Sequence, residues 1–259
     1  MVSDSSLPII PAPTSPAPDS ALNSQVRLKP AEGHLLLFLP PAPPNNDPIS
    51  GPMWSELRQQ LNQRLNGAER FWQPQTEVHL IAGDRLLDSR QLQEIAEALG
   101  TVDLELKRVY TARRQTAVVA ATGGYSVEQS SIPTLNPASA TTSPLAEPLY
   151  LQMTVRSGVD IRHPGTVILL GDLNPGGTIV AEGDILVWGR VRGVVHAGAG
   201  GNSKSIITAL QMEPTLIRIA EHKARGPEKP PVQFEPEVAY MTPQGIRISR
   251  IADFAKMNR

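Results

Sequence analysis

A glycine-rich loop followed by a lysine is the part of this chain whose composition is nearest to a phosphate-binding motif. Residues 198–205 read GAGGNSKS, and the backbone N–H groups of such a loop can surround a phosphate. A phosphate-binding loop places a glycine directly before the lysine, but that position here is Ser203. Such a loop also begins a helix, whereas the β-branched residues 206–208 (IIT) follow. We therefore interpret the loop as a turn and predict no cofactor.

The histidines and carboxylates lack the spacing of a metal site or a catalytic centre. No two histidines lie four residues apart, and the chain has no cysteine, which excludes thiolate ligands and disulfides. His163 aligns with inward-facing positions of the repeat described below, so we expect it to be a packed histidine. Spacing alone assembles no Ser/His/Asp triad. We predict no catalytic residue and no metal site.

Two arginines and an asparagine are evenly spaced along the chain in a pattern that suits protein recognition. The interval from Arg156 to Asn174 equals the interval from Asn174 to Arg192. If this interval is one turn of a stacked repeat, the three side chains lie in one column beside small residues such as Ser157 and Gly158. Arginine is enriched at interface hot spots, so the column is a candidate protein-binding corner. The alternative is a solvated corner with ordinary surface arginines.

The same 18-residue period extends well beyond this column. Residues 165–171 (GTVILLG) align with residues 183–189 (GDILVWG). A fixed internal period indicates one structural unit stacked on the next. Eighteen residues divide into three sides of six, with alternate residues such as Val167 and Leu169 pointing inward. The period therefore predicts a triangular, right-handed parallel β-helix over residues 149–222.

The same alternation places an apolar stripe on the outside of the β-helix. Because Val167 and Leu169 point inward, their neighbour Leu170 points outward, and Trp188 lies one period further on in the same column. A short solenoid also has edge strands that must be capped or paired. We therefore predict a homodimer with Leu170 and Trp188 at its interface.

An α/β domain is predicted over residues 33–110. Short apolar runs bounded by proline or glycine indicate strands, and apolar residues at helical spacing indicate helices. One helix is capped by Asp88 or Ser89 and ends at Gly100. The predicted order is β-α-β-α-β, which with the β-helix makes a multi-domain α+β protein. The elements span 34–39, 53–71, 77–83, 88–99 and 102–106.

The remaining segments are rich in proline and polar residues. Residues 1–32 are predicted to be a disordered Pro-rich tail, because they hold too little apolar surface to offset the entropy of ordering. Residues 111–148 are predicted to be a linker, within which 111–121 could form a short helix. A fourth turn of the β-helix requires an insertion of about three residues after Gly198. Residues 223–259 form a C-terminal extension with the alternation of a hairpin.

Composition limits the classes of function. The net charge is −1 and aromatic residues make up 4%, so neither a basic field nor base stacking favours nucleic acid. No apolar run approaches the ~18 residues of a membrane span, and the N-terminus lacks the pattern of a signal peptide. These features favour a soluble cytoplasmic protein.

Four spaced motifs lie in order between residues 149 and 222: residues 156–158 (RSG), 171–176 (GDLNPG), 181–189 (AEGDILVWG) and 192–198 (RGVVHAG). Together they resemble the C-terminal domain of the bacterial septum-site protein family MinC. The N-terminal α/β domain is similar to the same family more weakly.

The resemblance implies a two-domain inhibitor of cell division. In the family the N-terminal domain antagonises polymers of FtsZ, and the β-helix dimerises and binds MinD, a membrane-bound ATPase that recruits the inhibitor to the inner membrane. The family's MinD-binding motif is Arg-Ser-Gly-Gln, which Arg156, Ser157 and Gly158 match, while Val159 replaces the glutamine. A cation near the first strand is implicated in FtsZ binding, and Lys29 is the candidate here.

The resemblance and the stacking pattern thus select the same corner for MinD. Its residues are Arg156, Ser157, Gly158, Asn174 and Arg192. Two other classes of function remain open from the sequence. One is a β-helix acyltransferase with an acyl-CoA donor, and the other is a cytoskeletal scaffold with no role in division.

Overall fold

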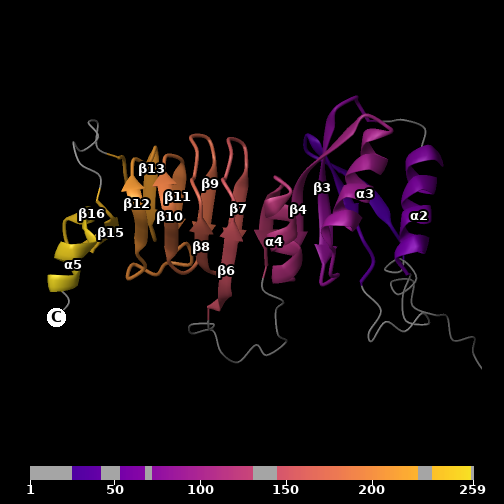
Figure 1. Cartoon of the computed structure of the whole chain (residues 1–259). Coiled ribbons are helices and arrows are strands. Elements are labelled where there is room, and N and C mark those ends of the chain that lie inside the picture. Colours follow the sequence, from indigo (N-terminus) through magenta and orange to yellow (C-terminus); the bar gives the residue numbers. More distant parts are fainter. Residues whose placement is uncertain (1–24, 42–52, 68–71, 131–144, 227–234, 258–259) are drawn as a thin grey trace, which may run out of the picture.

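The computed structural model describes residues 25–41, 53–67, 72–130, 145–226 and 235–257. In Figure 1 the α/β domain, the β-helix and a C-terminal hairpin form one row. Two sheets run through this row, one of ten strands and one of six. No helix among the described residues is long and apolar enough to cross a membrane.

The α/β domain has the predicted β-α-β-α-β order. Strands β2, β3 and β4 are parallel neighbours, and helices α2 and α3 bury their apolar faces in the core. The predicted cap of α3 is confirmed at Asp88, whose Oδ1 accepts a hydrogen bond from the Gln91 N–H at 2.7 Å. The bounds are β2 (His34–Phe38), α2 (Trp54–Gly67), β3 (Thr76–Gly83), α3 (Ser89–Gly100) and β4 (Leu104–Thr111).

Ordered structure extends beyond the predicted limits of this domain on both sides. Strand β1 (Arg27–Ala31) pairs antiparallel with β2, so the end of the segment predicted to be disordered is a strand. It is an edge strand, and proline is tolerated there because one side of the strand has no partner among the described strands that needs the missing N–H. Residues 1–24 of the predicted tail lie outside the described residues.

The predicted linker also begins with folded structure. Helix α4 (Arg114–Thr122) fills part of the segment, and strand β5 (Ser126–Gln129) pairs with β4. The domain boundary at residue 110 was therefore too early. Helix α4 belongs to the domain because it buries small side chains, since Ala117, Ala120 and Ala121 are fully enclosed. Small residues gave a weak apolar signal in the sequence, and residues 131–144 lie outside the described residues.

The predicted three-sided β-helix is confirmed. One side stacks β6 (Ala146–Gln152), β8 (Gly165–Leu170), β10 (Ile185–Val191) and β12 (Ile207–Met212) in parallel. A second side stacks β7 (Asp160–His163), β9 (Thr178–Ala181), β11 (Val194–Ala197) and β13 (Leu216–Ile219). Single bridges from Val155 to Leu173 and from Leu173 to Val191 form the third side.

Register across the coils follows the period. Val167 pairs with Ile185 at the predicted offset of 18, whereas Ile185 pairs with Ile207 at an offset of 22. The loop after Gly198 thus inserts four residues, close to the three expected. The inward residues Val167, Leu169 and Ile185 are fully buried, each contributing about 1.5–3 kcal/mol of transfer free energy.

The C-terminal extension closes the far end of the β-helix. The predicted hairpin is confirmed as β15 (Glu237–Thr242) and β16 (Gly245–Arg250), and β15 pairs antiparallel with β12. Strand β14 (His222–Ala224) pairs with β13, and α5 (Ile251–Met257) follows the hairpin. These strands occupy the edge that a bare solenoid would leave unpaired.

Candidate partner-binding corner

The predicted corner is built from three successive turns of backbone. The Asn174 N–H donates to the Val155 carbonyl at 2.9 Å, and the Arg192 N–H donates to the Leu173 carbonyl at 2.8 Å. The Gly158 N–H donates to the Gly176 carbonyl at 2.9 Å. These bonds hold each turn directly on the next, so the structure brings the Arg156, Asn174 and Arg192 positions together as predicted.

The side chains of this column differ in whether they are bonded to other residues of the chain. Arg192 Nη2 donates to Asn174 Oδ1 at 2.6 Å, and both residues are half-buried. Arg156 is exposed and makes no ion pair within the described part of the chain. Its five N–H donors therefore face solvent above a backbone turn that is held in place, which suits a carboxylate or carbonyl of a partner.

The backbone of the corner requires glycine at two stacked positions. Gly158 has φ +83° and Gly176 has φ +80°, both in the left-handed region that favours glycine. A Cβ atom on Gly176 would clash with the Ser157 hydroxyl oxygen, whereas a Cβ on Gly158 would meet open space. Gly176 thus makes room for Ser157, and Gly158 leaves the outer surface flat for a partner.

An ion pair that the sequence reasoning missed lies beside the column. Asp172 Oδ1 accepts the Arg190 N–H at 2.8 Å, and Oδ2 accepts Arg190 Nε at 3.1 Å and Nη2 at 3.0 Å. These bonds, the backbone one first, hold the pKa of the Asp172 carboxyl below its usual range, with the charge of Arg192 acting in the same direction. The signal was available, because Asp172 and Arg190 are also separated by one period of the repeat.

Val159, which replaces the family's glutamine, belongs to the core beneath the corner. Its side chain is buried, its N–H donates to the Arg156 carbonyl at 3.2 Å, and its carbonyl accepts the Thr178 N–H at 2.9 Å. An apolar side chain fits this buried place without an unpaired polar group. The replacement therefore leaves the exposed part of the corner to Arg156, Ser157 and Gly158.

Lys29 lies in a different part of the molecule. It is exposed on β1, the outer strand of the α/β domain, and its Nζ lies 5.5 Å from the centre of the Phe38 ring. Arg27 approaches the same ring, with its guanidinium carbon 5.4 Å from the centre. The structure thus gives Lys29 an aromatic neighbour and does not bring it to the corner.

The predicted dimer residues share one outer face of the β-helix. Trp188 pairs in register with Leu170, and Trp188 is 68% exposed while Leu170 is half-buried. Tyr150, which pairs with Ile168, extends the apolar face and was missed by the sequence reasoning. The spacing could have revealed it, because Tyr150 precedes Ile168 by one period.

The other residues with possible chemistry take structural roles. His163 is buried, with Nδ1 3.1 Å from Gln129 Oε1 and Nε2 3.0 Å from the Glu147 carbonyl oxygen. This confirms the expected packed histidine, and burial lowers its pKa. The glycine-rich loop leads into strand β12, with no helix between, as predicted.

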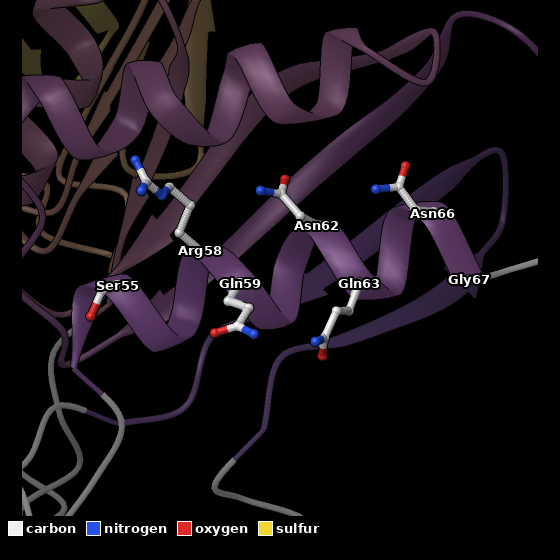
Figure 2. Close-up of a pocket in the computed structure, with 7 residues that line it drawn as sticks. All are labelled: Ser55, Arg58, Gln59, Asn62, Gln63, Asn66 and Gly67. Atoms are coloured by element: carbon white, nitrogen blue, oxygen red, sulfur yellow. The ribbon is translucent and has the colours of Figure 1, made fainter.

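A large open hollow lies along helix α2, away from the corner. Its volume is about 710 Å³, and Figure 2 shows polar side chains spaced along the helix at its edge. Arg58, the charged residue of this set, lies 3.7 Å from Glu94 on α3. The hollow offers amide groups for hydrogen bonding, and its lining among the described residues holds no histidine or carboxylate that could activate the Ser55 hydroxyl. Its lining comprises Ser55, Arg58, Gln59, Asn62, Gln63, Asn66 and Gly67.

Comparison with known proteins identifies relatives of the whole described architecture. Residues 149–251 match the family model described as "Septum formation inhibitor MinC, C-terminal domain", which includes the C-terminal hairpin beyond the predicted limit of 222. The chain is 57% identical over 236 residues to a probable septum site-determining protein MinC from Nostoc sp., covering 90% of this chain and 64% of the relative.

Two further relatives carry the same description over most of their own length. The protein from Gloeobacter violaceus is 48% identical over 242 residues, which cover 92% of this chain and 83% of the relative. The protein from Thermosynechococcus vestitus is 49% identical over 198 residues, which cover 76% of this chain and 74% of the relative. A solved structure titled "MinC:MinD cell division protein complex", from Aquifex aeolicus, is 34% identical over 44% of this chain and 96% of that chain, with a TM-score of 0.40.

Proposed function

This chain belongs to the MinC family of septum site-determining proteins, and we propose that it inhibits septum formation by linking MinD to FtsZ. Family membership is supported along both folded parts, because the relatives at 48% and 49% identity match over most of their own length. The chain spans 64% of the length of the Nostoc relative. The protein acts by binding rather than by catalysis.

The corner of the β-helix is the MinD-binding surface in this proposal. The observation that carries it is the stacked column, in which Arg192 is fixed against Asn174 while Arg156 stays exposed beside the flat turn at Gly158. This column offers a partner one guanidinium that is unpaired among the described residues, that of Arg156, with open backbone beside it at Gly158. This arrangement favours recognition of an ATPase surface through charge-assisted hydrogen bonds.

The α/β domain supplies the part of the molecule that antagonises FtsZ. Lys29 is our candidate contact, because it is exposed on an edge strand and held near the Phe38 ring. Binding to MinD would place this domain at the cytoplasmic face of the inner membrane, where septal polymers form. The protein would reach the membrane only through MinD.

A homodimer would strengthen recruitment to a MinD-coated membrane. The exposed Trp188 and its neighbour Leu170 form a face suited to a second copy of the chain. Two corners on one dimer would bind two MinD molecules, and the second binding step would be intramolecular. Avidity would then make recruitment depend steeply on MinD density.

The experiment that tests the MinD assignment is co-sedimentation with MinD on lipid vesicles in the presence of ATP. Loss of a charge-assisted hydrogen bond costs about 1.5–3 kcal/mol, so Arg156→Ala should weaken recruitment about tenfold or more. The matched control is Arg90→Ala, which removes an exposed arginine of helix α3. Equal recruitment of wild type and Arg156→Ala would place the MinD site elsewhere.

A further inference from the structure

The α/β domain is joined to the β-helix by a strand pair as well as by the chain. Strand β5 pairs in parallel with β7, with Val127 opposite Ile161 and Glu128 opposite Arg162. Val127 and Ile161 are fully buried in one continuous apolar core. The ten-stranded sheet therefore runs from the α/β domain into one side of the β-helix (Figure 1). Strand β5, which lies within the predicted linker of residues 111–148, thus joins the two parts instead of separating them.

Polar contacts at this junction reach the corner itself. Ser126 Oγ donates to the Gly158 carbonyl at 3.3 Å and accepts the Asp160 N–H at 3.1 Å. Arg108 Nη2 lies 3.1 Å from Asp160 Oδ2, with both side chains mostly buried. A hydroxyl and a guanidinium of the α/β domain thus hold the residues that follow Arg156 in the chain.

A groove of about 570 Å³ lies between the two parts at this junction. The corner forms one wall with Ser157 and Gly158, and strands β3 and β4 form the other. Glu105 and Lys107 project from β4 as an exposed ion pair, and His79 of β3 lines the same groove. The groove is therefore polar, open to solvent, and continuous with the corner.

A stable protein interface needs a larger surface than the corner alone provides. Specific protein interfaces bury about 800 Å² on each partner and use about 20–30 residues a side. The exposed turn at residues 156–158 is a small fraction of that number. A partner centred on this turn must therefore cover its neighbours. The next coil, with Asn174, lies on one side, and the groove wall of β4 lies on the other.

We propose that MinD bound at the corner also enters this groove and contacts the α/β domain at Lys107, so that both parts of the chain hold the partner. This inference rests on the proposed function, because it takes the corner as the centre of the MinD site. Lys107 stands on the groove wall with Glu105 as its one ion-pair partner among the described residues. It can exchange that exposed partner for a carboxylate of MinD at little cost.

Site-specific crosslinking tests the proposal directly, because the chain has no cysteine of its own. A photoreactive maleimide on Lys107→Cys should crosslink to ATP-bound MinD on vesicles. The same probe on Pro175→Cys, an exposed residue of the next coil, reports on the corner, and Arg90→Cys on helix α3 is the negative control. Crosslinks from both Pro175→Cys and Lys107→Cys support the groove. A crosslink from Pro175→Cys alone overturns it, and none from either position refutes the MinD site itself.

Two further variants test the proposal: one reverses the charge of Lys107, and the other links β5 to β7 by a disulfide. Lys107→Glu should weaken recruitment about threefold to tenfold, whereas Arg90→Glu should leave it unchanged. Neighbouring strands lie about 4.8 Å apart, within the span of a disulfide, so Glu128→Cys with Arg162→Cys can lock β5 to β7. We expect the oxidised and reduced forms to bind MinD equally. Binding by the reduced form alone would show that the domains must separate, which contradicts the proposal.

Discussion

The α/β domain and the β-helix bury similar apolar residues in different ways. In the β-helix each core residue stacks on its counterpart one turn away, as Val167 does on Ile185. In the α/β domain the core forms between unlike elements, as where Leu61 of helix α2 and Leu80 of strand β3 join the same core. A repeat therefore places its binding residues by spacing alone, whereas an irregular domain needs the complete fold to place them.

The contrast extends to the candidate sites. The column of the corner combines Arg156, Asn174 and Arg192, which come from three coils and occupy the same position in the repeat. Lys29 instead depends on the pairing of β1 with β2, which brings it beside Phe38.

Cavities in the two cores should destabilise one shared folding unit. Leu169→Ala in the β-helix and Leu80→Ala in the α/β domain each truncate a fully buried side chain, which typically costs about 2–5 kcal/mol. Because the core and the ten-stranded sheet run through both parts, we expect each variant to shift the same single transition in calorimetry. Two transitions, each sensitive to one variant, would show that the parts fold independently.

A charge on the outer face of the β-helix should disrupt the dimer without affecting the core. Trp188→Asp places a carboxylate in an apolar contact, and loss of a hot-spot residue costs about 2 kcal/mol or more. Analytical ultracentrifugation should then show a dimer dissociation constant raised about thirtyfold or more. The matched control is Leu86→Asp, which changes an exposed leucine of the α/β domain. Identical sedimentation of both variants would move the interface away from Trp188.

Arg156→Ala at the corner should have the next largest effect, a tenfold or greater loss of recruitment to MinD. Its comparison within the molecule is Lys29→Ala. That substitution should leave MinD recruitment unchanged and should reduce the inhibition of FtsZ sedimentation. If Lys29→Ala weakened MinD recruitment as much as Arg156→Ala does, the division of roles between the two parts would be wrong.

His163, at the junction of the two parts, should give a small dependence of stability on pH. Burial lowers its pKa below the unfolded value of about 6.5, so the unfolded chain binds more protons as the pH falls. The contribution of His163 to the free energy of unfolding is therefore greatest above pH about 6.5 and falls as the pH drops below that value. Denaturant unfolding between pH 7.5 and pH 5 should show this loss.

The matched variant for that measurement is His163→Gln, which keeps a polar side chain near Gln129 and removes the titrating ring. It should reduce the pH dependence, typically by less than about 2 kcal/mol, and leave a remainder from His79 and His196, whose pKa values are also lowered by burial. An unchanged pH profile would show that His163 does not contribute to it.

Most of the β-helix could be predicted from the sequence because its order repeats. The constant offset between turns placed Arg156, Asn174 and Arg192 in one column and turned Trp188 outward. The same rule would also have found Asp172 with Arg190, and Tyr150 beside the apolar face. Each of these residues lies one period from its counterpart, so the information for them is present in the sequence.

The limits of the α/β domain were harder to predict because they depend on pairing and packing that leave a weak local pattern. Strand β1 has only five residues and a proline, and it is stable because β2 pairs with it. Helix α4 buries alanines, whose small side chains give a weak apolar pattern. Strand β5 has four residues, and it lies between β4 and β7 in the sheet. Its pairing with β7 joins segments that are not adjacent in the chain.

The β-helix, the position of its corner and the outward direction of Trp188 all follow from the order of the amino acids, because a fixed period converts spacing directly into stacking. The junction does not follow from that order: that β5 joins the two parts, and that Ser126 and Arg108 contact the turn after Arg156, is visible only in the folded chain. Backbone pairing between distant strands leaves no local pattern in the sequence. The free energy that stabilises this pairing comes from buried surface and hydrogen bonds, which form only when both strands are in place.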